Sequence, residues 1–157
     1  MNEITTKSFL PSTITNELEI GTAYVGIDFG TSTSVVSVAQ YNPKSNAIET
    51  RSIRIPQMLS DGHTINKSEI IPTVIAFLED EETILIGNGA FELKNKKKLG
   101  QDIWYSFKLG LGEDMGAKYT DSLLRDKPPF NIQTAKDATQ VFFAYLKRVI
   151  SKELGAR

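Results

Sequence analysis

The sequence contains no cysteine and one histidine, His63, among its 157 residues. The absence of cysteine excludes disulfides and thiolate metal sites, and one histidine makes no metal cluster. No stretch reaches the roughly 18 apolar residues that a membrane span needs. The first residues lack the basic region and apolar run of a signal peptide. These absences predict a cytoplasmic, soluble protein without a membrane partner.

The chain also has no large excess of charge of one sign. It contains 18 basic and 19 acidic residues, and its net charge is -1. This balance gives no reason to expect a nucleic-acid partner. The apolar fraction of 40% and the charged fraction of 24% are typical of a globular protein. A chain of this length can bury one core of ordinary size.

Strand-like patterns fill the first half of the chain, where β-branched residues recur between turn signals. The Asp61-Gly62 pair predicts a turn, and acidic residues at 79–82 predict another. The expected elements are strands at 23–30, 33–41 and 47–56, a loop at 58–69, and a hairpin at 70–87.

The second half ends in the clearest helix, residues 134–155, whose apolar residues recur with helical spacing. Thr134 followed by Asp137 predicts a capping box, and Gly155 suits the position after the helix. Upstream, residues 90–100 are basic and predict a helix, whereas 103–112 fit either helix or strand. The order of elements favours an α/β or α+β fold.

The stretch "VGIDFGTSTSVVSVA" places an acid and several hydroxyls at the tip of the first hairpin. Gly30 permits a close backbone approach, and Thr31, Ser32 and Thr33 offer donors to phosphate oxygens. Asp28 would repel phosphate alone but suits Mg²⁺, which takes a carboxylate together with phosphates. A solvated surface hairpin is the alternative. The apolar flanks predict two buried core strands, which favours a ligand site at their end.

Other phosphate motifs are missing, since no G-x-x-x-x-G-K-[ST] occurs and a P-loop NTPase is excluded. The hairpin instead resembles the first phosphate motif of the actin-like ATPase superfamily, which includes actin, heat-shock chaperones and sugar kinases. Further stretches are similar to the seventy-kilodalton chaperones of the DnaK type. They are "SEIIPTVIAFLEDEETILIGNGA", "IWYSFKLGLG" and "AYLKRVISKELG", in that family's order.

The resemblance implies lobe I of an actin-like, ribonuclease H-like α/β fold, a mixed sheet with flanking helices that is incomplete. We expect the chain to be the N-terminal part of a larger protein, because an apolar helix such as 134–155 normally leads back into a sheet. The implied organisation is a flexible extension at 1–22 and a partial domain at 23–157, with an inner subdomain at 23–72 and 130–157 and an outer one at 73–129.

The resemblance also implies a function, a chaperone ATPase that binds ATP or ADP with Mg²⁺ and acts on client polypeptides with co-chaperones. Asp28 matches the family residue that contacts the water shell of Mg²⁺. Gly30, Thr31, Ser32 and Thr33 match the turn around the β- and γ-phosphates. Alone, this part of the protein is expected to bind nucleotide weakly and to self-associate through exposed apolar surface.

The sequence departs from the family pattern at the position of a catalytic residue. The family's catalytic Lys corresponds to Phe91, which cannot stabilise charge on a transferring phosphoryl group. Lys94, one helical turn later, is the candidate substitute. Two alternatives therefore stay open, a sugar or metabolite kinase of the same superfamily and a non-catalytic binding module that keeps the fold.

Overall fold

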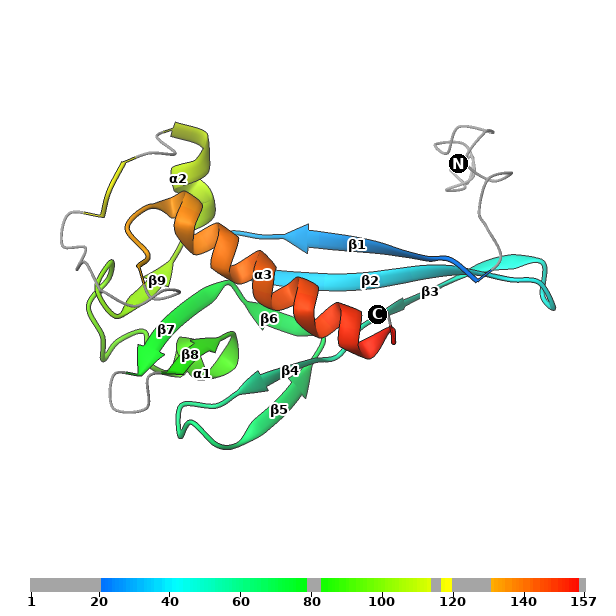
Figure 1. The fold of residues 1–157 in the computed structure, drawn as a ribbon, viewed down its shortest axis with the longest axis horizontal. Coiled ribbons are helices and arrows are strands. Elements are labelled where there is room, and N and C mark those ends of the chain that lie inside the picture. The colour runs from blue at the N-terminus through cyan, green and yellow to red at the C-terminus, as the bar shows by residue number, and fades with distance from the viewer. Residues whose placement is uncertain (1–20, 79–82, 114–116, 120–130, 156–157) are drawn as a thin grey trace, which may run out of the picture.

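The computed structural model describes residues 21–78, 83–113, 117–119 and 131–155 (Figure 1). Residues 1–20 of the predicted extension and the predicted acidic turn at 79–82 lie outside them. The elements are β1 (Ala23–Phe29), β2 (Thr33–Asn42), β3 (Ala47–Ser52), β4 (Ile55–Met58), β5 (Ile65–Ser68), β6 (Ile70–Pro72), β7 (Val74–Leu78), β8 (Thr83–Ile86), α1 (Asn88–Glu92), β9 (Ile103–Tyr105), α2 (Phe107–Glu113) and α3 (Ala135–Glu153).

The predicted first hairpin is present as β1 and β2, which pair antiparallel from Ala23 opposite Gln40 to Phe29 opposite Ser34. The other side of β2 pairs with β3 and, near its start, with β6. A second sheet has the order β8-β7-β9. All pairs between these strands are antiparallel, so the described residues form a mixed fold of antiparallel sheets and helices.

The chain passes from the first sheet to the second at Thr73, between β6 and β7. Thr73 is fully buried, and its amide donates a hydrogen bond to the Ser32 carbonyl oxygen at 2.8 Å. The passage coincides with the subdomain boundary expected after residue 72. The division into inner and outer subdomains stays a prediction.

The predicted loop at 58–69 is wrong in part, because residues 65–68 form β5 and pair with β4 as a separate two-stranded sheet. The turn predicted at Asp61-Gly62 is present between β4 and β5. The Asp61 carboxylate accepts hydrogen bonds from the Thr64 hydroxyl and the amides of Thr64 and His63, which hold the pKa of Asp61 at about 2. Likewise the strand expected at 47–56 is divided into β3 and β4.

The predicted helix at 90–100 is shorter than expected, because α1 ends at Glu92 and turns follow. The ambiguous segment 103–112 contains both structures, β9 and then α2. Ser106 joins them with a left-handed backbone, φ 55°. Trp104 and Phe107, on either side of that junction, are buried.

The final helix is confirmed as α3. The Thr134 hydroxyl accepts a hydrogen bond from the Asp137 amide at 3.1 Å, and the Asp137 carboxylate accepts one from the Thr134 amide at 2.9 Å. This is the predicted capping box, and such caps typically contribute about 1 kcal/mol. Gly155 follows the helix with a φ of 65°, as its predicted position requires.

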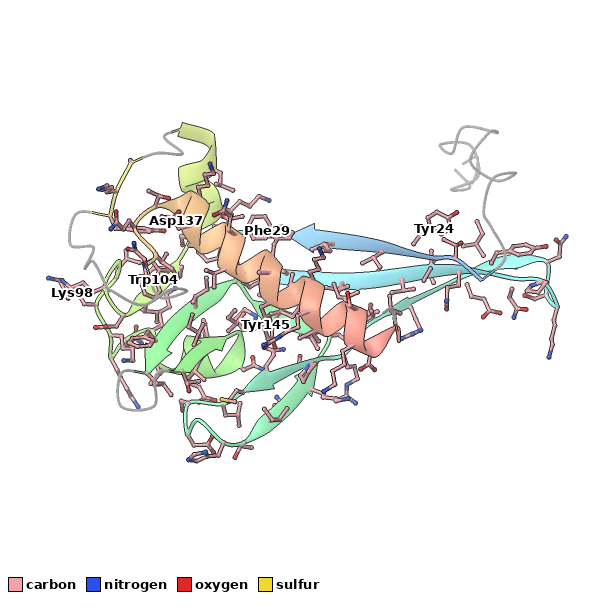
Figure 2. The ribbon with its side chains drawn as sticks, viewed as in Figure 1. Tyr24, Phe29, Lys98, Trp104, Asp137 and Tyr145 are labelled. Atoms are coloured by element: carbon pink, nitrogen blue, oxygen red, sulfur yellow. The ribbon has the colours of Figure 1, made fainter. Side chains whose placement is uncertain are left out.

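One stripe of α3 is buried in the larger of two hydrophobic clusters, where it packs with strands of all three sheets. Its buried residues are Ala135, Ala138, Phe142, Leu146, Val149 and Ile150. The same cluster contains Val36 of β2, Ile55 of β4 and Ile75 of β7. Figure 2 shows Tyr145 on the side of α3 that faces β4, where its hydroxyl donates to the Pro56 carbonyl oxygen. Burial raises the pKa of Tyr145 to about 12.

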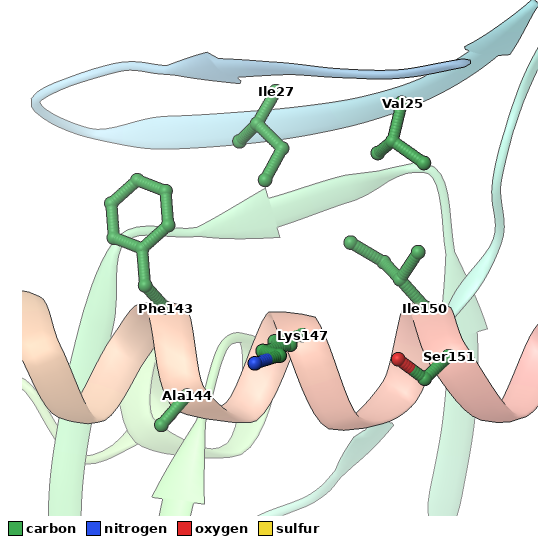
Figure 3. Close-up of a pocket in the computed structure, with 7 residues that line it drawn as sticks. All are labelled: Val25, Ile27, Phe143, Ala144, Lys147, Ile150 and Ser151. Atoms are coloured by element: carbon green, nitrogen blue, oxygen red, sulfur yellow. The ribbon is translucent and has the colours of Figure 1, made fainter. Parts of the chain in front are cut away.

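The prediction that β1 is a buried core strand is wrong for the described residues. Val25 is 41% exposed and Ile27 36% exposed, because among the described strands β1 pairs only with β2. Figure 3 shows both side chains directed toward α3, where Phe143 and Ile150 face them across an apolar groove. We call this hollow the β1 groove.

The β1 groove gives the expected self-association a location. Replacing Ile27 with Glu places a charge among apolar side chains, so any self-association through this groove should weaken by about tenfold or more. Sedimentation velocity over a range of concentrations measures it. Lys44→Glu, at the exposed far end of the first sheet, is the control and should leave self-association unchanged. Equal behaviour of both variants and the parent would remove the β1 groove from the contact.

Candidate functional site

The turn between β1 and β2 is closely packed upon itself. A Cβ atom on Gly30 would lie 2.2 Å from the Thr33 carbonyl oxygen, which is backbone and cannot move aside cheaply. Only glycine therefore fits at position 30. The main chain of residues 30–32 then comes closer to the start of β2 than any other residue would allow.

Thr73 supports this turn through polar contacts with Ser32 and Ser34. Its amide holds the Ser32 carbonyl oxygen at 2.8 Å, and its hydroxyl lies 2.9 Å from the Ser34 hydroxyl in a buried contact. The hydroxyl of Ser34 is thus used within the protein, whereas Ser32 and Thr33 are exposed and Thr31 is half-buried. Sequence reasoning missed Thr73, which lies between Pro72, the last residue of β6, and Val74, the first residue of β7.

An aromatic cluster fixes the end of β1 on the other side. The Phe29 ring lies 5.0 Å from Phe143, 5.9 Å from Phe142 and 6.1 Å from Phe107, measured between centroids. Figure 2 shows Phe29 at the tip of β1 beside the first half of α3. Such pairs contribute about 0.5–1.5 kcal/mol each beyond the area that they bury. The turn is therefore held against both α2 and α3.

A cation reaches the turn from α2. The Lys108 ammonium donates a hydrogen bond to the Phe29 carbonyl oxygen at 2.5 Å and lies 5.7 Å from the centre of the Phe29 ring. The two residues are 79 positions apart. Ammonium groups offer three donors, and the contact with Phe29 uses one of them. Sequence reasoning matched Lys108 to the family pattern but did not place it at the site.

The structure brings the predicted residues together on one exposed tip. Asp28 is exposed and lies opposite Val35, two positions before Gly30. The exposed hydroxyls of Ser32 and Thr33 follow it in the same turn, and the ammonium of Lys108 reaches the turn at the Phe29 carbonyl oxygen. A carboxylate, hydroxyls and a nearby cation suit a magnesium ion bound together with phosphate oxygens.

A metal cage made of protein side chains alone is not seen in the described part of the chain, where no group of three or more His, Cys, Asp or Glu residues comes together. Magnesium keeps several waters and takes one or two carboxylates plus substrate phosphates. Asp28 fits that role because its carboxylate is exposed beside the turn.

Phe91 and Lys94 lie elsewhere. Phe91 is 54% exposed on α1, which Figure 1 shows beside β7 and β8 and apart from the β1–β2 turn. The Lys94 ammonium lies over the Tyr105 ring, 4.3 Å from its centre. The proposed substitution of Lys94 for the family's Lys stays a prediction, and Lys108 is the cation that the structure places at the turn.

No protein-family model and no curated protein matches this sequence. Within the described part of the chain, no helix combines the length and the apolar character needed to cross a bilayer.

The packing of Gly30 can be tested by thermal unfolding. Gly30→Ala brings a methyl group against the Thr33 carbonyl, and we expect a loss of about 1–3 kcal/mol, as for other overpacked sites. For a chain of this size each kcal/mol lowers Tm by about 2–4 °C. Gly26→Ala is the matched control on the same strand, because a Cβ there meets nothing within 4 Å. A Tm for Gly30→Ala equal to that of the control would show that the turn has room for a side chain.

Proposed function

We propose that this chain forms one wall of a Mg-ATP cleft in a chaperone ATPase of the DnaK type, on an actin-like, ribonuclease H-like fold. The observation that supports the proposal is the β1–β2 turn, which contains Asp28, Gly30 and two exposed hydroxyls, and which Lys108 contacts at the Phe29 carbonyl oxygen. Client polypeptides and co-chaperones belong to the same proposal.

Each residue of the turn has a role in this proposal. The main chain around Gly30 approaches the β- and γ-phosphates, and Thr31, Ser32 and Thr33 donate to their oxygens. Asp28 accepts hydrogen bonds from the waters on magnesium. Lys108 directs its remaining N–H groups toward phosphate, and a bond to a charged group of this kind contributes about 1.5–3 kcal/mol.

The magnesium ion would neutralise the phosphates and so allow Asp28 to lie near them. The protein's own part in hydrolysis would be positioning and electrostatic stabilisation, as in other phosphoryl transfers. Lys108 takes the cationic role in this proposal, because Lys94 is engaged with Tyr105.

A non-catalytic binding module is the second candidate, and the exposed Phe91 favours it. In that case the turn binds nucleotide without accelerating its hydrolysis. Release of phosphate from Mg-ATP at the rate of buffer alone by the larger protein to which we expect this chain to belong, with nucleotide binding saturated, would support the module over the ATPase.

Binding can be followed through the backbone amides. On addition of Mg-ATP we expect chemical-shift changes at residues 28–34 and a weak Kd, on the order of 1 mM, because one wall of a cleft gives few contacts. Asp28→Asn and Lys108→Met should each raise the Kd about tenfold, since each removes a charged contact.

Lys94→Met provides the control, a lysine whose ammonium also lies over an aromatic ring but away from the turn, and it should leave the Kd unchanged. Omitting magnesium should reverse the effect of Asp28→Asn, because the carboxylate alone repels phosphate. Shifts confined to other parts of the chain, or equal affinities for all three variants, would contradict the proposal.

A further inference from the structure

A second groove runs along the opposite flank of α3 from the β1 groove. It lies between α3, the β4–β5 hairpin and β8, and two adjoining hollows share four of its residues, Ile84, Ile86, Tyr145 and Arg148. The larger hollow has a volume of about 610 Å³. Its lining residues are Pro56, Met58, Ile65, Lys67, Ile84, Ile86, Tyr145, Arg148, Val149, Lys152 and Glu153. We call it the hairpin groove.

The floor of the hairpin groove is apolar and stays partly open. Ile84 and Ile86 of β8 form it together with Val149 of α3. Ile65, on β5, is 53% exposed at its wall. An exposed isoleucine over an apolar floor leaves surface that a partner can cover.

The rim of the hairpin groove is basic. Arg148 and Lys152 lie four positions apart on α3, which places them on one side of the helix, and Lys67 lies on β5. All three are exposed, and none forms an ion pair with a carboxylate of the described residues. Glu153 is the single acidic residue in the lining. Three cations against one acid leave a positive edge beside apolar surface.

We propose that the hairpin groove binds an acidic peptide segment of another protein. The apolar side chains of the segment enter between Ile65 and the floor, and its carboxylates pair with Arg148, Lys152 and Lys67. Charge complementarity selects this partner over a neutral or basic one. The inference concerns a surface away from the β1–β2 turn and does not depend on nucleotide binding.

The size of the groove suits a short segment. From Val141 to Lys152 the helix advances about 16 Å, at 1.5 Å for each residue. An extended peptide covers that length with about five residues. Alternate side chains of such a peptide point to opposite sides, so a sequence that alternates apolar and acidic residues can present one kind to the floor and the other to the rim.

The β1 groove provides an internal comparison. It is apolar as well, but Lys147 is the one cation in its lining. Lys147 precedes Arg148 in the chain and is also exposed, but it lines the β1 groove. A charge reversal at Lys147 is therefore the control for a charge reversal at Arg148.

Fluorescence anisotropy tests the proposal with a labelled ten-residue peptide of alternating Leu and Glu. We expect binding that weakens as salt increases, because the rim charges are exposed. Arg148→Glu combined with Lys152→Glu should raise the Kd at least tenfold, and Lys147→Glu should change it less than twofold. Ile65→Ser keeps the charge and should weaken binding several-fold through lost apolar contact.

Two further probes sharpen the result. The same peptide with Lys in place of Glu should bind at least tenfold more weakly than the acidic one. Dodecanoate represents an anionic amphiphile and should not displace the peptide. The proposal is overturned if the basic peptide binds as well as the acidic one, if Lys147→Glu acts like the Arg148 and Lys152 changes, or if dodecanoate binds and the peptide does not. Equal Tm values among the variants, all at exposed positions, exclude unfolding as the cause.

Discussion

Burial of one stripe of α3 is the interaction on which the described structure depends. A two-stranded sheet such as β4–β5 is marginal in water by itself, and the other sheets are small. Phe142 and Leu146 are fully buried where these sheets meet, and each contributes about 1.5–3 kcal/mol of transfer free energy. Since a helix buries only one stripe in this way, both flanks of α3 stay accessible, and a groove lies along each.

The β1–β2 turn depends on the same helix. Phe142 and Phe143 of α3 contact Phe29, which ends β1 immediately before Gly30. Thr73, at the junction of the two sheets, also holds the turn, so the turn is fixed by contacts from this junction and from two helices. Fixing the main chain in advance lowers the entropy that a bound phosphate would otherwise have to offset. A surface hairpin without a ligand does not need that degree of support.

Local features were predictable from the sequence, and those that depend on distant partners were not. The capping box of α3 involves Thr134 and Asp137, three positions apart, and periodicity identified the helix. The β5 strand was missed because Ile65, Asn66 and Lys67 are all exposed, and their pattern lacks a buried face. The exposure of β1 was missed for another reason. Val25 and Ile27 have the composition of a core strand, whereas an edge position is set by which strands lie beside them.

The position of Lys108 could not be read from the sequence, because it depends on the left-handed backbone at Ser106 and on the burial of Phe107. Its placement bears on the two candidate functions. A cation bonded to the Phe29 carbonyl lies on the protein side of the turn, where it can neutralise a bound phosphate. In the proposed cleft, the group that orients an attacking water would lie on the far side of the γ-phosphate, and the residue that matches the family's Lys is Phe91. Under that proposal the chain is better suited to bind nucleotide than to hydrolyse it.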